Sequence, residues 1–208
     1  PFLIVIAPLD NFFMTLLFFL SGIGTYYAIQ YRNEREYRKE RAKKLLIPFI
    51  FGTILLCPIQ AFPKALYDGF SGDFLHFIPQ FFSKKIVYYL GYAHLWFLLY
   101  LFIFSLCCLP LFTKWLNDKT KMDNLSSLLC KGNKILMPIG FICLSELFLR
   151  PFSGSQTIIG DWANDVIYSS MFIFGFVYAY DSKIQERINQ LYKPAKYILT
   201  ISIPVYVF

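Results

Sequence analysis

The chain has 208 residues, of which 57% are hydrophobic and only 16% are charged, and its formal net charge is +7. Soluble domains average about 45–50% apolar and about 25% charged residues, so a chain of this length cannot hide such an apolar excess from water. The composition excludes collagenous, disordered and nucleic-acid-binding proteins. It favours a helical membrane protein, because the apolar residues fall in runs rather than in the alternation of a lipid-facing β-barrel strand.

Apolar runs follow one another along the whole chain. A helix that crosses about 30 Å of hydrocarbon needs about 20 mostly apolar residues. The fourth run is short and needs part of its flanks to span. The predicted fold class is an all-α, polytopic transmembrane helix bundle, a single integral membrane domain over residues 1–208. We expect about six spans, at 10–31, 45–63, 92–113, 135–149, 163–180 and 196–208.

Basic residues are concentrated in alternate connections between these runs. By the positive-inside rule, the connections rich in Lys and Arg are cytoplasmic, and residue 1 starts on the outer side. We therefore expect an integral membrane protein that contacts the lipid bilayer, with no nucleic-acid partner. Of the 20 Lys and Arg residues, four lie in 64–91 and 150–162, and 16 lie in 32–44, 114–134 and 181–196.

The connection after the first run is a basic segment that leads into the second run. Read as a helix, it places Glu34 beside Arg38 and Glu40 beside Lys44, four residues apart in the favourable order. Arg38, Arg41 and Lys44 recur every three residues and share a broad basic face. This face is either a solvated surface that fixes topology and touches anionic lipid, or an anion site. In the second case the Arg41 guanidinium and the Lys44 ammonium hold the phosphates of a cytoplasmic donor.

A histidine stands at the outer entrance of the third run. His94 is followed closely by Trp96, an aromatic residue expected at interface depth. An imidazole in this place is either a general base toward a hydroxyl or a hydrogen-bonded interface residue.

Two acidic residues lie at the outer ends of the fourth and fifth runs, where carboxylates are costly and therefore candidates for function. Glu146 comes four residues before Arg150, which favours a structural ion pair. Asp161, followed by Trp162, either caps the fifth helix or lines an external site.

The small and sulfur-containing residues carry no chemical signature. Four of the five cysteines lie within apolar runs, and their spacing predicts neither a disulfide framework nor a metal site. Gly22 and Gly24 lie inside the first run, where small residues allow close helix approach.

Five short motifs, taken in order, resemble those of the membrane acyltransferase-3 family, and the resemblance covers nearly the whole chain. The most similar branch is the one associated with succinylation of periplasmic glucans. The family implies an integral inner-membrane O-acyltransferase of about ten helices. Such an enzyme moves an acyl group, acetyl or succinyl, from cytoplasmic acyl-CoA to a hydroxyl of a sugar or glycan at the outer face. The motifs are Phe18-Phe-Leu-Ser-Gly22, Lys39-Glu-Arg-Ala-Lys-Lys-Leu-Leu-Ile-Pro-Phe49, His94-Leu-Trp-Phe-Leu98, Gly160-Asp-Trp162 and Phe174-Gly175.

The resemblance also assigns roles to individual residues. Arg41 and Lys44, with Arg38 nearby, match the family's Arg-x-x-Arg pair that engages acyl-CoA, although a Lys in the second place lacks the bidentate fork. His94 and Asp161 then position the acceptor or the base. Acyl-CoA is the donor substrate, and no cofactor is expected.

The family's own catalytic His precedes its Phe-Leu-Ser-Gly motif by one helix, upstream of residue 1. We therefore expect the chain to be an internal piece of a longer protein, truncated at both ends. Two alternatives stay open. One is a polytopic transporter or flippase in which Glu146, Asp161 and His94 line a path. The other is a catalytically inactive fragment.

Overall fold

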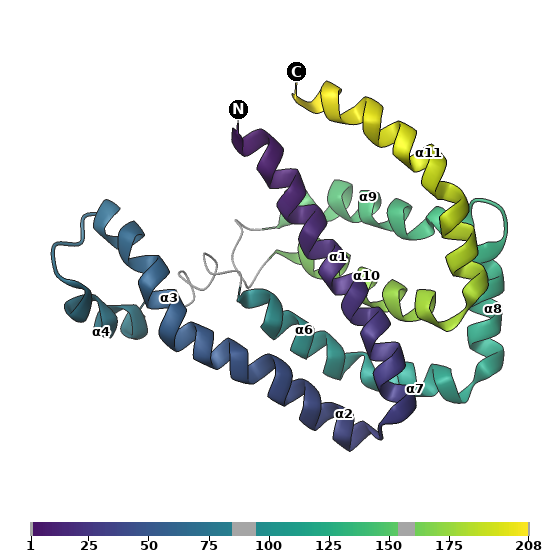
Figure 1. The fold of residues 1–208 in the computed structure, drawn as a ribbon, viewed down its shortest axis with the longest axis horizontal. Helices are drawn as coiled ribbons and strands as arrows, with labels where there is room; N and C mark the ends of the chain where they lie inside the picture. Colours follow the sequence, from purple (N-terminus) through teal and green to yellow (C-terminus); the bar gives the residue numbers. More distant parts are fainter. Residues whose placement is uncertain (1, 85–94, 154–160, 208) are drawn as a thin grey trace.

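The computed structural model describes residues 2–84, 95–153 and 161–207, and this part of the chain is helical, with no strand (Figure 1). The prediction of an all-α helical bundle is confirmed. The π-helical segment Ala42–Leu46 joins α2 to α3, and short 3-10 turns flank α9. The α-helices are α1 (Phe2–Tyr31), α2 (Glu34–Arg41), α3 (Ile47–Tyr67), α4 (Phe74–Lys84), α6 (Trp96–Cys107), α7 (Leu109–Asn117), α8 (Lys119–Cys130), α9 (Met137–Leu149), α10 (Trp162–Tyr180) and α11 (Ser182–Val207).

Three helical segments are long and apolar enough to cross a membrane. They are Phe12–Tyr31, Glu34–Tyr67 and Lys134–Phe152, and they contain nearly all of the first, second and fourth predicted runs. The segment Lys134–Phe152 includes the flanks that the short fourth run, 135–149, needs, because the 3-10 turns on either side extend α9. The helix of the first run begins at Phe2, eight residues before the predicted start at residue 10.

The third predicted run, 92–113, is not one straight helix. Helices α6 and α7 together pass the length and hydropathy test for a span, but their axes differ by 41° across the break. Pro110, the second residue of α7, has no N–H to donate to the carbonyl of Leu106, which weakens the ladder at this point. The span is therefore bent near Cys108, and residues 92–94 lie outside the described part of the chain.

The fifth and sixth predicted runs are also helical. Helix α10 matches 163–180 within one residue, but Asn164 and Asp165 in its first turn make it less apolar than the three spans above. Helix α11 begins at Ser182, so residues 182–196, predicted as a connection, already belong to the helix that contains 196–207. By length and composition the described residues hold three candidate spans, or four if the bent pair counts as one. The number six stays a prediction.

Helices α1 and α10 cross at two glycines and form the closest helix pair in the bundle. A Cβ atom added at Gly22 would lie 2.0 Å from the carbonyl oxygen of Phe172, and one added at Gly175 would lie 2.0 Å from that of Phe19. Only a residue without a side chain permits this approach on either helix. The expectation that Gly22 serves close helix packing is confirmed, whereas Gly24 has no atom of another residue nearby.

Aromatic rings fill the space between α1, α6, α7 and α10. Phe112 stacks on Phe176 with ring centroids 3.8 Å apart, and Phe18 stacks on Tyr168 at 4.7 Å. Phe172 is fully buried and contacts Phe112 at 5.8 Å. Because lipid tails are as apolar as these rings, dense packing and ring geometry, rather than escape from water, hold this core together.

Candidate functional site

Polar side chains gather at two places, which lie at opposite ends of α10. We call one the basic end; it is formed by α2, α7, α8 and the last turns of α1 and α10. The other, which we call the Arg150 end, is formed by the last turn of α9 and the first turns of α6 and α10. The basic end lies at the lower right in Figure 1, and α10 runs between the two ends. Most of 32–44 and of 114–130, both rich in Lys and Arg, belongs to the helices that form the basic end.

At the basic end, Arg41 is anchored on the first helix. Its guanidinium donates from Nη2 to Oγ1 of Thr25, 2.8 Å away. The Thr25 hydroxyl donates its own proton to the carbonyl of Ser21 at 2.9 Å, so the contact of 3.1 Å with Tyr37 makes the Tyr37 hydroxyl the donor. The guanidinium also lies 5.1 Å from the centre of the Tyr37 ring, within the range of a cation–π interaction.

Thr25 and Tyr37 are almost completely buried, with 0% and 1% of their surface exposed. The anchor forms because Asn33 starts α2 at a fixed place. Its side chain accepts from the backbone N–H of Glu36, and the Glu36 carboxylate accepts from that of Asn33. This capping box turns the chain directly after α1, so that α2 folds back and Tyr37 reaches Thr25.

The other two predicted acyl-CoA ligands face solvent. Arg38 pairs with Glu34 at 3.3 Å and Lys44 pairs with Glu40 at 2.6 Å, so both predicted pairs four residues apart are confirmed. Lys44 keeps 69% of its side chain exposed. Arg41 turns towards α1, whereas Arg38 and Lys44 are engaged in solvated ion pairs, so the structure does not gather the three into one cluster.

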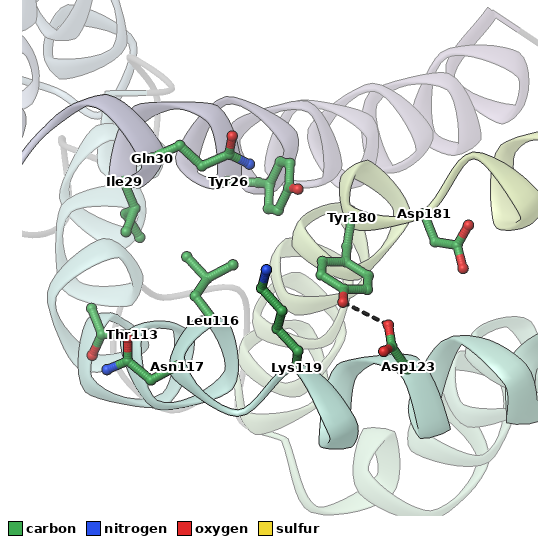
Figure 2. A pocket seen from close by; sticks show the side chains of 10 residues that line it. All are labelled: Tyr26, Ile29, Gln30, Thr113, Leu116, Asn117, Lys119, Asp123, Tyr180 and Asp181. Atoms are coloured by element: carbon green, nitrogen blue, oxygen red, sulfur yellow. Dashed lines mark hydrogen bonds between the residues drawn. The ribbon is translucent and has the colours of Figure 1, made fainter.

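A pocket of about 780 Å³ opens at the same end of the bundle, between α1, α7, α8 and α10 (Figure 2). Its polar wall includes Tyr26, Gln30, Asn117 and Lys119. Tyr26 follows Thr25 directly in the sequence. Nothing in the local spacing of these residues predicts the pocket, because its walls come from segments about 60 to 150 residues apart in the sequence.

At the Arg150 end, one guanidinium binds two carboxylates and an amide. Arg150 donates to both Glu146 oxygens at 2.8 and 2.6 Å, which confirms the predicted ion pair. It also donates to the two Asp161 oxygens at 3.1 and 3.3 Å and to the side-chain oxygen of Asn164 at 3.0 Å. Asp161 is only 5% exposed, so the guanidinium supplies the positive charge that this buried carboxylate needs.

Asp161 also caps α10, as one of its two predicted roles requires. Its Oδ1 accepts from the backbone N–H of Asn164 at 3.2 Å, and its Oδ2 accepts from the Asn164 side chain at 2.7 Å. The partial positive charge at the start of a helix adds to this stabilisation. Both oxygens of Asp161 are occupied by donors.

An aromatic wall adjoins this network. Trp96 lies 5.5 Å from Tyr100 and 5.7 Å from Tyr168, measured between ring centroids. Tyr100 shares a side-chain hydrogen bond with Asp165, one turn after Asp161. The structure thus brings Trp96, Glu146 and Asp161 to one end of the bundle. Sequence reasoning missed three polar residues of this end, which are Tyr100, Asn164 and Asp165.

One predicted residue does not join this cluster, and another lies outside the described residues. Trp162 follows Asp161 but is 64% exposed, because the residue after a cap points away from the side chain that caps. His94 lies outside the described residues, and so does Gly160 of the Gly-Asp-Trp motif.

Metal ligands do not come together in the described part of the chain, where no group of three His, Cys, Asp or Glu side chains is placed to hold an ion. The five cysteines are free thiols, and only Cys57 among them is buried.

A helical bundle in which three segments, or four with the bent pair, are long and apolar enough to cross a membrane is the architecture of an integral membrane protein. Comparison with family models gives the particular family. The model described as an acyltransferase domain, that of the acyltransferase-3 family, matches residues 1–208, and the chain belongs to this family of membrane acyltransferases. No curated protein and no solved structure matches the chain.

Proposed function

We propose that the protein is an O-acyltransferase of the inner membrane. It takes acyl-CoA at the basic end and transfers the acyl group to a hydroxyl of a sugar or glycan at the Arg150 end, on the outer face. The observation that supports this most directly is the anchored guanidinium of Arg41. A side chain fixed by a buried hydroxyl and an aromatic ring is preorganised for an anion, because its remaining donors do not have to be ordered on binding.

The chemistry needs one proton transfer and one substitution at the thioester. A base takes the proton of the acceptor hydroxyl, and the oxygen attacks the thioester carbonyl carbon. The carbon–sulfur bond breaks, and the thiolate of coenzyme A leaves and receives the proton from the base. The products are the ester and free coenzyme A, so atoms and charges balance without a cofactor.

In this scheme Asp161 is a positioning residue rather than the base. Both of its oxygens already accept hydrogen bonds from Arg150 and Asn164, and a carboxylate paired with a guanidinium is a weak proton acceptor. Asp161 fixes the first turn of α10, and with it the aromatic wall on which a sugar ring can stack. His94 and Trp96 complete the acceptor side.

Binding of acyl-CoA to the full-length protein in nanodiscs tests the donor site. We expect Arg41→Ala to weaken acyl-CoA affinity about tenfold or more, because it removes charge-assisted hydrogen bonds. Lys44→Ala should weaken it less, since the Lys44 ammonium is already paired with Glu40. Arg35→Ala, an exposed change of the same charge on α2, is the control. Unchanged affinity in Arg41→Ala, with normal membrane insertion, rejects the assignment.

The proposed sidedness has its own test. In a variant without the native cysteines, Lys131→Cys reports on the basic end and Ser71→Cys on the connection between α3 and α4; both positions are exposed. A membrane-impermeant thiol reagent added to intact cells should label only the second. Labelling of Lys131→Cys from outside would reverse the orientation.

A further inference from the structure

The pocket at the basic end has the size and chemistry of a ligand site. Its volume of about 780 Å³ falls within the range of about 300–1,000 Å³ that small-molecule sites occupy. It opens on the side of the bundle where Arg41 is anchored, and its wall begins with Tyr26, the neighbour of Thr25. Arg41 itself is not among the residues that line the pocket.

Its polar groups divide into two parts. In Figure 2 the Lys119 ammonium projects into the opening between Leu116 and Tyr26, and Gln30 and Asn117 lie on one side of it. The carboxylates of Asp123 and Asp181 lie on the other side. The pocket therefore has a cationic and amide part and an acidic part, which suits a ligand with both an anionic group and hydrogen-bond donors.

The acidic part is held in place by bonds within the protein. Asp123 accepts from the Tyr180 hydroxyl at 2.7 Å. Asp181 accepts from the Ser126 hydroxyl and, at 2.9 Å, from the backbone N–H of Lys183. Each carboxylate has further lone pairs that can accept from a ligand's hydroxyl or amino groups. These bonds fix α8 against the end of α10, so the pocket wall exists before a ligand arrives.

The cationic part of the pocket, Lys119, is not held by bonds to other described residues as the two carboxylates are. Among the described residues, the Lys119 ammonium makes no ion pair or hydrogen bond, and its side chain is exposed at the mouth. By contrast Lys121, two residues later, pairs with Asp118 at 2.7 Å. An ammonium that projects into a preformed pocket without a partner is available for an anionic group such as a phosphate.

Two phenol rings complete the site. Tyr26 and Tyr180 meet edge to face with centroids 6.2 Å apart, and both line the pocket. Aromatic faces bind planar heterocycles by stacking, and carboxamides read the hydrogen-bonding edges of bases. Ring faces, a carboxamide edge, an ammonium and carboxylates together match a purine nucleotide: a base, a ribose with hydroxyls, and a phosphate.

We propose that this pocket seats the nucleotide end of the acyl donor, with a phosphate on Lys119 and with the base and ribose hydroxyls between Tyr26, Gln30 and Asp123. This inference rests on the proposed function, because it takes acyl-CoA as the donor. It assigns the nucleotide to α1, α7, α8 and α10 rather than to the exposed face of α2.

Equilibrium binding of adenosine 3′,5′-bisphosphate to the full-length protein in nanodiscs tests the pocket. We expect Lys119→Ala to weaken binding about tenfold and Gln30→Leu to weaken it about fivefold, since each loses one hydrogen bond to the ligand. Lys114→Ala, which makes the same charge change on α7 outside the pocket, should bind as the wild type does. Lys119→Ala removes an exposed side chain and leaves the core unchanged, so loss of folding does not confound this variant.

The transfer reaction supplies a second readout. Wild-type protein should prefer acyl-CoA over the matching S-acyl-pantetheine, which lacks the nucleotide, and Lys119→Ala should reduce this preference in kcat/KM about tenfold. If Lys119→Ala and Lys114→Ala behave alike, the pocket assignment is wrong, while acyl transfer by the wild type still supports the proposed function. If the wild type binds the bisphosphate but transfers no acyl group, the proposed function fails and the nucleotide site stands.

Competition identifies what the pocket recognises. Inorganic pyrophosphate and anionic lipid in the nanodisc both present phosphate without a nucleoside. We expect neither to displace the bisphosphate at equal concentration. Displacement by either would show an anion site without nucleoside recognition and would overturn the proposal.

Discussion

The two ends of the central helix α10 treat charge in opposite ways. At the Arg150 end, one guanidinium binds Glu146, Asp161 and Asn164, and every partner is a side chain of the same cluster. At the basic end, Arg41 is anchored, but its neighbours Arg38 and Lys44 form solvated ion pairs and Lys119 projects into an open pocket. A closed network fixes the backbone. A cation such as Lys119, which has no partner among the described residues, is available to a ligand from solution.

This difference predicts where mutations harm stability and where they harm binding. Removal of a partner from the closed network leaves a buried charge without compensation. Removal of a solvated cation leaves only water in its place, so folding changes little and affinity for an anion changes more.

The largest effect on stability is expected for Arg150→Met. Asp161 then keeps a buried carboxylate without its cation, and we expect a loss of about 3 kcal/mol in the free energy of unfolding. Denaturant titration in detergent micelles measures this value. Arg150→Lys is the control and should lose less, because it keeps the charge without the fork. A loss below about 0.5 kcal/mol in Arg150→Met would show that the network is not structural.

The second largest effect on stability is expected at the crossing of α1 and α10. Gly175→Ala forces a Cβ to within 2.0 Å of the Phe19 carbonyl oxygen unless the helices separate, and we expect a loss of about 2 kcal/mol. Gly24→Ala, on the partner helix α1, places its Cβ where no atom lies within 4 Å and should be neutral or slightly stabilising. Thermal unfolding of both variants separates steric overlap from helix propensity; equal stability of the two would contradict the observed crossing.

At the basic end, Tyr37→Phe should cost about 1 kcal/mol. The ring and its contact with Arg41 stay, but the hydroxyl that donates to the buried Thr25 is lost. Tyr27→Phe, half-exposed on the adjacent helix, is the matched control. If the anchor also orients Arg41 for acyl-CoA, Tyr37→Phe should weaken donor binding about threefold, whereas an unchanged dissociation constant would confine Tyr37 to a structural role.

The smallest effect concerns pH at the junction of α8 and α11. Burial raises the pKa of Asp181, but the bonds from Ser126 and from the Lys183 amide, with the Lys183 charge, outweigh it and hold the pKa below its usual value of 3.8. Because the folded-state pKa is the lower one, Asp181 contributes stability above pH of about 4, and the contribution is lost as the pH falls through the folded-state value.

Hydrogen exchange of the α8 amides measures this loss. Protection should stay constant from pH 7 to about 4 and fall below it, once intrinsic exchange rates are corrected. In Asp181→Asn the protection should not change over the same range. A fall that begins near pH 6 in the wild type would point to another titrating group.

The sequence allowed prediction of those features that depend on local spacing. Ion pairs four residues apart and the Asp161 cap follow from spacing, and the structure has them. Most helices follow from the apolar runs, but the structure divides 92–113 between two helices and begins α11 at Ser182. The bend between α6 and α7 could have been read from Pro110, a residue that lacks the N–H an unbroken helix needs. It was missed because proline is common in membrane helices and does not always bend them.

Contacts between distant segments could not be predicted. Thr25 and Arg41 are 16 residues apart and meet only because α2 folds back on α1. Asn164 joins Arg150 over an interval of 14 residues, and Tyr180 meets Asp123 over an interval of 57 residues. Such pairs depend on which helices are neighbours, and neither composition nor spacing contains that information.

The bend before α7 helps to set the shape of the pocket at the basic end. Leu116 and Asn117 line the pocket because α7 departs from the axis of α6 by 41°. The dimensions of the pocket therefore depend partly on Pro110, a residue that is not among those lining it. Selection for a bulkier or smaller ligand can act on this remote hinge while every lining residue stays the same, so two relatives with identical pocket residues can still differ in the ligands they accept.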